Sequence, residues 1–331
     1  KKIVLILDML LSEFRIYFRK ILSEFYSNRE IDTFFKILID FYFDWKATFI
    51  GLNPNYVLDS NQLKKLKFAL AELELGKPIQ YVTNQAFFLN NEFYVNDSVL
   101  IPRPETEELV KWVLDDINEY KITSPHLMDI GTGSGCIAIS LAKANREIKL
   151  TAIDLSKEAL IVAKKNASKH KVKIDFVQED IQSLSHLNRT FDIIVSNPPY
   201  IHPDEKKDIL PNVLNHEPHM AIFTPNNDPI YFYRLIINFA SKVLKSTGRF
   251  SSLEEHRLVY EAMVNLVLHE VGHTLGLSHN FYSSNFHSLN NIYDRNKTEP
   301  VGLTSSVMDY EAVNIGKHNN WTGQFYSTTP G

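Results

Sequence analysis

The sequence is poor in cysteine, in long apolar runs and in excess positive charge. Its 331 residues include one cysteine, Cys136, which excludes an internal disulfide framework and fits a reducing compartment. No apolar run is long enough to span a bilayer, so we expect no membrane partner. The net charge of −4 argues against a general nucleic-acid binder, and we expect no direct nucleic-acid partner.

An export signal is also lacking. Residues 1–7 faintly resemble a signal peptide, but Asp8 interrupts them and no small-residue cleavage site follows. We therefore expect a helix there and a cytoplasmic protein. What is present is an ordinary globular mixture, 44% hydrophobic and 22% charged, with a length that suits two or three domains.

Apolar residues recur at helical spacing over residues 1–75, and Gly76 and Pro78 mark a stop. The clearest 3.6-residue stripe is Leu63, Leu66, Leu70 and Leu73. The pattern predicts a helical N-terminal domain. Two interpretations stay open: a bundle with a purely structural role, and a bundle that binds a partner.

The next segment has the pattern of a β-hairpin. Phe87–Leu89 and Phe93–Val95 suit two strands joined by a turn at Asn90-Asn91. Two prolines then favour extended backbone, after which Glu105 or Thr106 can open a helix.

Strands and helices alternate over residues 126–197, which is typical of a parallel sheet. The first strand is followed directly by the glycine loop Gly131-Thr132-Gly133-Ser134-Gly135, where the backbone can approach a ligand and a helix N-terminus offers free N–H groups. The second strand ends at Asp154, about 20 residues later, which suits ribose hydroxyls. The third strand leads to Asp180 and Ile181, which fit the sides of an adenine ring. This order predicts an adenosine-containing cofactor, either a dinucleotide or S-adenosylmethionine.

A fourth strand, Phe191–Ser196, ends in Asn197-Pro198-Pro199-Tyr200. The prolines fix the backbone, so the Asn197 amide and the Pro198 carbonyl are held at the carboxyl end of a strand, where open α/β sheets bind ligands. Two acceptors can hold a planar –NH2 group, and Tyr200 offers an aromatic wall. Methyl transfer to an amino group uses such acceptors and hydride transfer does not, which favours S-adenosylmethionine. The plainer alternative is a strand followed by a proline turn.

Four motifs in order carry a resemblance: Gly76–Tyr81, Leu100–Glu107, Gly131–Gly135 and Asn197–Ile201. Over roughly residues 1–250 the chain resembles the peptide chain release factor N(5)-glutamine methyltransferases, the HemK family. The resemblance implies a helical N-terminal substrate-recognition domain followed by a Rossmann-like class I methyltransferase sheet. It also implies methylation of the glutamine amide of a Gly-Gly-Gln motif in release factors. Methylation of a nucleic-acid base amine stays an alternative, because Asn-Pro-Pro-Tyr also suits adenine.

Spacing and resemblance together give the predicted site. The predicted cofactor-binding residues are Gly131, Thr132, Gly133, Ser134, Gly135, Asp154, Asp180, Ile181 and Asn197. The predicted substrate-binding residues are Asn197, Pro198, Pro199 and Tyr200, of which Asn197, Pro198 and Tyr200 are also predicted to act in catalysis.

Beyond residue 250 the sequence changes character. His269 and His273 share one helix face, Gly276 permits a turn that brings His279 round, and Glu270 can activate a metal-bound water. Three histidines and a water predict an open zinc site. The segment Ser306–Tyr310 resembles the Met-turn of metzincin peptidases, with Met308 beneath the metal and Tyr310 near it. Residues 254–331 thus resemble the C-terminal part of a bacterial zinc-dependent metalloprotease, without its upstream strands.

The chain therefore resembles two partial enzymes joined near residues 250–253 with no linker. We expect domains at 1–78, 79–250 and 251–331: a helical bundle, an α/β methyltransferase sheet truncated at its C-terminal strands, and a mainly helical zinc-site fragment. A natural fusion, a chimera and a gene-model artefact stay open. Three function classes follow: a glutamine methyltransferase, a zinc endopeptidase, and an inactive chain that only binds cofactor or metal. The pattern does not fix an oligomeric state.

Overall fold

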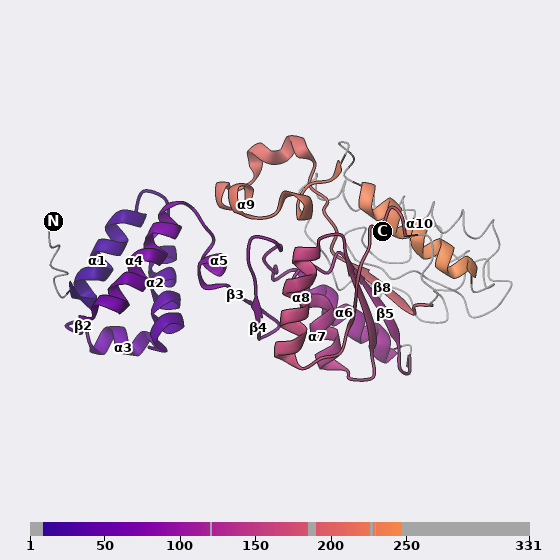
Figure 1. Cartoon of the computed structure of the whole chain (residues 1–331), viewed down its shortest axis with the longest axis horizontal. Coiled ribbons are helices and arrows are strands. Elements are labelled where there is room, and N and C mark those ends of the chain that lie inside the picture. Colours follow the sequence, from indigo (N-terminus) through magenta and orange to yellow (C-terminus); the bar gives the residue numbers. More distant parts are fainter. Residues whose placement is uncertain (1–8, 120, 185–189, 226–227, 229, 247–331) are drawn as a thin grey trace, which may run out of the picture. The chain divides into compact units, whose positions relative to one another are not determined.

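The computed structural model describes residues 9–119, 121–184, 190–225, 228 and 230–246 (Figure 1). These residues fall into two compact units. The first lies within Lys1–Gln178 and Val195–Pro229, and the second comprises described residues of Glu179–Ile194 and those from Ile230 onward. The whole 251–331 segment lies outside the described residues.

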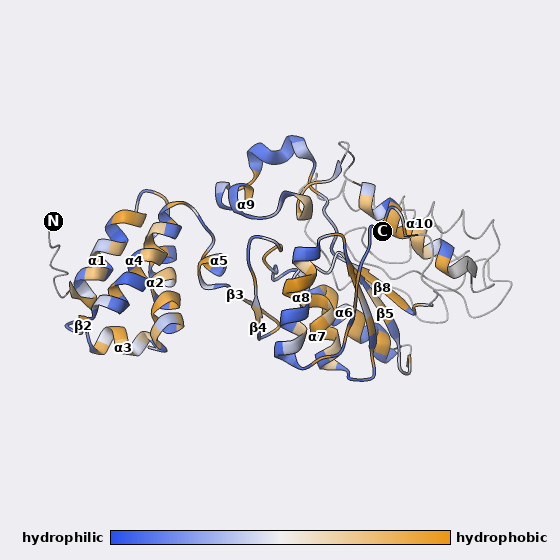
Figure 2. Cartoon of the chain, in the orientation of Figure 1, coloured by the Kyte–Doolittle hydropathy of each residue, from blue (hydrophilic) through white to orange (hydrophobic). Residues whose placement is uncertain are grey.

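The N-terminal part is a helical bundle, as the apolar spacing predicts. Its helices are α1 (Leu11–Leu22), α2 (Asn28–Phe43), α3 (Ala47–Leu52) and α4 (Ser60–Glu74). Each of α1, α2 and α4 carries both apolar and polar stretches, as amphipathic helices do (Figure 2). The apolar faces meet in one core that contains Phe14, Phe18, Phe35, Leu38 and Leu66. A short antiparallel pair, β1 (Met9–Leu10) with β2 (Val57–Leu58), was not predicted.

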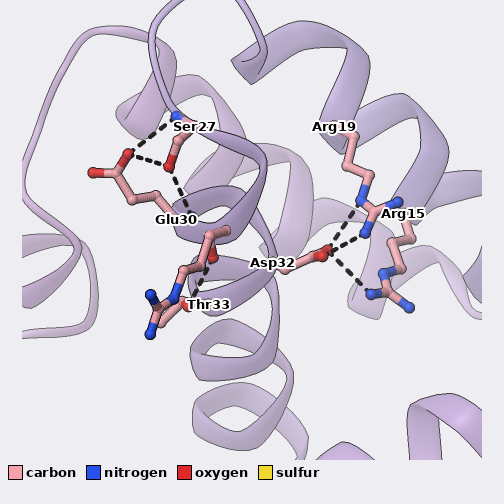
Figure 3. A network of polar contacts seen from close by, with 7 residues as sticks. Arg15, Arg19, Ser27, Glu30, Asp32 and Thr33 are labelled. Atoms are coloured by element: carbon pink, nitrogen blue, oxygen red, sulfur yellow. Dashed lines mark hydrogen bonds and ion pairs between the residues drawn. The ribbon is translucent and has the colours of Figure 1, made fainter.

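Two polar features order α2, one at its N-terminus and one against α1 (Figure 3). Ser27 caps α2 by accepting from the Glu30 N–H, and the Glu30 carboxylate accepts from the Ser27 N–H in return. Asp32 of α2 pairs with Arg15 and Arg19 of α1, and Arg15 Nη2 lies 3.1 Å from Asp32 Oδ1. The Arg19 hydrogen bond is the largest cause that lowers the pKa of Asp32. These partly exposed ion pairs orient α1 against α2, while the apolar core supplies most of the stability.

After α5 (Ile79–Thr83), the chain forms the expected hairpin from β3 (Gln85–Phe88) and β4 (Asn91–Tyr94). The turn was placed one residue too late, because its central residues are Leu89 and Asn90, with φ of 46° and 58°. Asn91 instead pairs with Phe88 in the ladder, and its Nδ2 donates to the Leu89 carbonyl at 2.8 Å. That side-chain hydrogen bond supports a left-handed conformation that leucine rarely adopts.

The predicted α/β sheet has four described strands in the order β7-β6-β5-β8. They are β5 (His126–Ile130), β6 (Lys149–Asp154), β7 (Asp175–Gln178) and β8 (Ile193–Ser196), and both β5–β6 and β6–β7 are parallel. The helices between them are α7 (Cys136–Ala144) and α8 (Lys157–His170), and α6 (Thr106–Glu119) precedes β5. The chain runs outward from β5 to β6 and β7, then returns to the other side of β5. The ends of β5 and β8 therefore flank the switch point of the sheet, where ligands bind in such folds.

Short helices follow β8 before a long helix. They are η1 (Pro203–Asp208), α9 (Pro211–His216) and η2 (His219–Ala221), and the long helix is α10 (Tyr231–Ser246). A parallel bridge pairs Ile201 with Phe223 and closes the loop after Asn-Pro-Pro-Tyr. In the described part of the chain, no helix combines the length and apolar character that a membrane crossing requires.

Candidate active site

The glycine loop forms a tight turn between β5 and α7. The N–H groups of Gly131 and Thr132 both donate to the Ile153 carbonyl of β6, at 2.9 and 3.0 Å, and Gly135 N donates to the Thr132 carbonyl at 2.8 Å. The three glycines have φ of 71°, 54° and 81°, which only glycine adopts without strain. The loop therefore needs glycine at these positions for its backbone alone.

The surroundings of the glycines differ. A Cβ built on Gly131 or Gly133 would meet nothing within 4 Å, whereas one on Gly135 would lie 3.0 Å from Ile139 Cδ1 and 3.3 Å from Ala163 Cβ. The first two glycines thus leave open space that a ligand can fill. Gly135 serves the close approach of α7 and α8.

Asp129 lies fully buried at the end of β5 and was not among the predicted site residues. Its Oδ2 accepts from the Thr132 hydroxyl at 2.6 Å, while Oδ1 accepts no hydrogen bond of ordinary geometry from any described residue. Burial raises the pKa of Asp129 to about 7, although the Thr132 hydrogen bond works against that rise. A fully buried carboxyl that accepts from Thr132 of the glycine loop favours positive charge near that loop.

Asp154 ends β6 as predicted and contacts the glycine loop. Its Oδ2 accepts from Gly133 N at 2.8 Å and its Oδ1 accepts from Ser156 N at 2.9 Å. Burial raises the pKa of this half-buried carboxyl, and its backbone hydrogen bonds oppose the rise. Asp154 therefore shapes the loop, and its predicted role at a ribose stays a prediction.

A second residue that sequence reasoning missed is Asn166 of α8. It is fully buried, and its side chain makes three hydrogen bonds. Oδ1 accepts from Tyr94 N at 2.7 Å, while Nδ2 donates to the Tyr94 and Ser134 carbonyls, both at 2.9 Å. One amide thus joins strand β4 to the glycine loop. An asparagine among apolar helix positions was the available signal.

Asn-Pro-Pro-Tyr lies beside the glycine loop at the end of β8. Ser196 Oγ donates to the Ile130 carbonyl at 2.7 Å, which joins the ends of β8 and β5. Asn197 is half-buried, and its Nδ2 donates to the hydroxyl of Thr106, the first residue of α6, at 3.2 Å. Pro198 is buried, Pro199 is half-buried and Tyr200 is 52% exposed. The structure therefore brings together the glycine loop, Asp154 and the Asn-Pro-Pro-Tyr segment.

The segment before α6 is anchored by a buried carboxylate, Glu217, that sequence reasoning also missed. Its Oε1 lies 2.6 Å from Arg103 Nη2, and its Oε2 accepts from Ile101 N at 3.1 Å. At the other end, Glu107 Oε1 accepts from Leu89 N at 2.8 Å. These contacts tie residues 101–107 to Glu217 at one end and to the hairpin turn at the other.

The remaining predicted residues are not placed at this site. Asp180 closes a turn after β7, where its Oδ1 accepts from Gln182 N at 2.9 Å. Asp180 and Ile181 belong to the second compact unit, so their role at a cofactor stays a prediction. The predicted zinc residues lie outside the described residues: Glu270, His269, His273, His279, Met308 and Tyr310.

Comparisons with known proteins match the region of the chain that contains this site. A family described as methyltransferase small domain matches residues 110–220, which include the glycine loop, Asp154 and Asn-Pro-Pro-Tyr. A second family, described as Met-zincin, matches residues 252–331.

Curated relatives cover most of the same region. The chain is 43% identical over 242 residues to the release factor glutamine methyltransferase of Flavobacterium psychrophilum, a match that covers 73% of this chain and 85% of that protein. It is 36% identical over 234 residues to the enzyme of the same name from Bacteroides thetaiotaomicron, which covers 70% and 83%. With this identity over this length, the chain belongs to the release factor glutamine methyltransferase family and has its class I methyltransferase fold, as the motifs predicted.

Proposed function

We propose that the chain transfers a methyl group from S-adenosylmethionine to the side-chain amide nitrogen of the glutamine in the Gly-Gly-Gln motif of peptide chain release factors. The observation that carries this proposal is the meeting of a glycine loop and a fixed asparagine amide at the neighbouring ends of β5 and β8. The names of the relatives support the choice of acceptor. Release factors act in translation, which places this function in the cytoplasm.

The residues of the loop fit the cofactor. Gly131 and Gly133 leave space for a close approach to the backbone, and the N-terminus of α7 lies at the same turn. The buried carboxyl of Asp129, which accepts from Thr132 of the loop, suits a positively charged group nearby. S-adenosylmethionine, when bound, supplies an electrophilic methyl group on a positively charged sulfur.

The chain's own contribution is orientation. An amide nitrogen is a weak nucleophile because its lone pair is delocalised. The Asn197 Oδ1 and the Pro198 carbonyl accept the two N–H groups of the substrate amide and turn its lone pair toward the methyl carbon. A carbon–nitrogen bond forms as the carbon–sulfur bond breaks, and the surplus proton on nitrogen leaves to water. Positioning and fixed dipoles supply the rate gain.

The test replaces Asn197 with alanine. Methyl transfer to a purified release factor, located by mass spectrometry, is expected to fall by roughly 10²–10³-fold, the effect of losing one preorganised hydrogen-bonding group. Affinity for S-adenosylhomocysteine, measured by calorimetry, should change far less, because the amide acts mainly on the acceptor. Transfer to adenine in DNA with none to glutamine would refute the proposal.

A second site is proposed for the C-terminal segment. The Met-zincin match over residues 252–331 supports zinc bound by His269, His273 and His279, with Glu270 near a metal-bound water. The proposal includes a division of the chain into three domains, at residues 1–78, 79–250 and 251–331. Metal analysis tests it: about one zinc per chain is expected, and His273→Ala should remove it. A zinc content near zero in the parent chain would end the metal proposal without affecting the methyltransferase.

A further inference from the structure

We propose that Thr106 is a positioning residue for methyl transfer: its hydroxyl holds the Asn197 amide by the nitrogen and so leaves the amide oxygen for the substrate. The inference rests on the proposed function of Asn197 and adds a residue to it. It starts from the 3.2 Å hydrogen bond between Asn197 Nδ2 and Thr106 Oγ1, which joins two residues 91 positions apart in sequence.

The chemistry of the acceptor makes the orientation of this amide decisive. An asparagine side chain carries an acceptor oxygen and a donor nitrogen of nearly equal size. Only the oxygen can accept from the –NH2 group of a glutamine, whereas a reversed amide would bring two donors together. A hydrogen bond that occupies the nitrogen therefore favours the productive orientation.

Thr106 is well suited to hold that amide. It is 9% exposed, and as a β-branched residue it has a restricted χ1. Its own N–H donates to the Arg103 carbonyl at 3.1 Å, and Arg103 pairs with the buried Glu217. The next residue, Glu107, holds the hairpin turn through Leu89 N. The hydroxyl is thus fixed by the backbone of α6 and by contacts on both sides.

The experiment compares Thr106→Val, which keeps the shape and removes the hydroxyl, with Thr106→Ser, which keeps the hydroxyl. Thr106→Val should lower kcat for release factor methylation by about tenfold, the worth of one hydrogen bond. KM and the affinity for S-adenosylhomocysteine should stay within about twofold, and Thr106→Ser should restore most of kcat. A merely structural role would move stability and affinity together with kcat.

Two controls isolate the contact. Thr83 is a matched buried threonine whose hydroxyl donates to the Ile79 carbonyl at 2.9 Å, so Thr83→Val should reduce stability without lowering kcat. Adding Thr106→Val to Asn197→Ala should produce no further loss, because the two residues act as one unit. A Thr106→Val variant with unchanged kcat, or a full additional loss in the double variant, would overturn the inference.

A second readout needs no substrate. The side-chain amide signal of Asn197, assigned in an NMR spectrum by its absence from Asn197→Ala, should exchange its hydrogens about tenfold faster in Thr106→Val than in the parent chain. Equal exchange rates would contradict the inference even if methylation is observed. If the parent chain methylates no release factor, the proposed function fails, and the exchange rates still decide whether Thr106 holds the Asn197 amide.

Discussion

The helical bundle and the ligand end of the sheet are stabilised in different ways. Between residues 9 and 78, the buried side chains that the structure describes are all apolar. Buried polar and charged side chains begin at Thr83, and several surround the site: Thr106, Asp129, Thr132, Ser134, Asn166 and Glu217. The bundle is therefore a packed apolar core with its charges outside, whereas the site keeps polar groups inside.

This difference shows where the fold buries polar side chains in place of apolar ones, in order to position groups at the site. A buried polar group needs a partner, and an unmet one destabilises the folded state. Asn166 and Glu217 meet that requirement with defined hydrogen bonds that tie the hairpin, the glycine loop and the segment before α6 together. Asp129 has one oxygen in use and the other without a hydrogen bond of ordinary geometry from the described residues. Directional contacts thus concentrate where a ligand has to be oriented.

The largest expected effect is a loss of stability in the apolar core of the helical bundle. Phe18 is fully buried in the bundle, 5.4 Å from the ring of Phe35 between centroids. Phe18→Ala should reduce the free energy of unfolding by about 3–5 kcal/mol, measured by urea denaturation, because it leaves a cavity in the core. Phe25→Ala is the control, since Phe25 is 58% exposed, and should change stability by about 0.5 kcal/mol or less. Similar losses in both variants would contradict a bundle held by core packing.

A smaller effect is expected from the buried polar residues around the site. Asn166→Ala should reduce the free energy of unfolding by about 2–4 kcal/mol, because it leaves backbone groups of Tyr94 and Ser134 without their partner. Freeing the Ser134 carbonyl also loosens the glycine loop, so affinity for S-adenosylhomocysteine should fall by about tenfold, which Phe18→Ala should not cause.

Asn61, exposed on α4, provides the matched control for that variant. Asn61→Ala should change stability by about 0.5 kcal/mol or less and leave the affinity for S-adenosylhomocysteine unchanged. A folded Asn166→Ala variant with parental affinity would show that the hydrogen bonds of Asn166 serve stability alone.

Sequence pattern was sufficient for the elements and insufficient for the contacts between them. The alternation of strands and helices predicted the parallel sheet. The glycines located the loop after β5 and the prolines located the turn after β8, since both depend on local chemistry. The hairpin turn was misplaced by one residue, because the Asn91–Leu89 hydrogen bond decides its position. Thr106–Asn197, Asn166–Ser134 and Arg103–Glu217 join residues 91, 32 and 114 positions apart, and no local pattern specifies such pairs.

The smallest expected effect is on the pH dependence of stability. It compares two aspartates, one at the site and one in the bundle, whose pKa values shift in opposite directions. Burial raises the pKa of Asp129 to about 7 in the folded chain, above its ordinary value near 4 in the unfolded chain. The folded state therefore binds more protons between about pH 4 and 7, and the free energy of unfolding falls as pH rises through that interval. Asp129→Asn should flatten this fall by about 1–2 kcal/mol between pH 5 and 7, since one whole proton corresponds to about 1.4 kcal/mol per pH unit.

Asp32 in the bundle should behave differently over the same pH range. Its pKa is lowered, chiefly by the hydrogen bond from Arg19, so its stabilising effect is complete above the unfolded pKa and is lost only as pH falls through the folded one. Asp32→Asn should therefore lower the free energy of unfolding by a constant amount of about 1 kcal/mol or less from pH 5 to 7 and leave the slope unchanged.

Asp116, whose pKa burial raises to about 6, contributes to the same slope as Asp129, so Asp116→Asn must be measured beside it. Urea titrations at several pH values give all three slopes. If Asp129→Asn and Asp32→Asn change the slope equally, the contrast between a fully buried site carboxyl and a partly exposed bundle carboxyl is wrong.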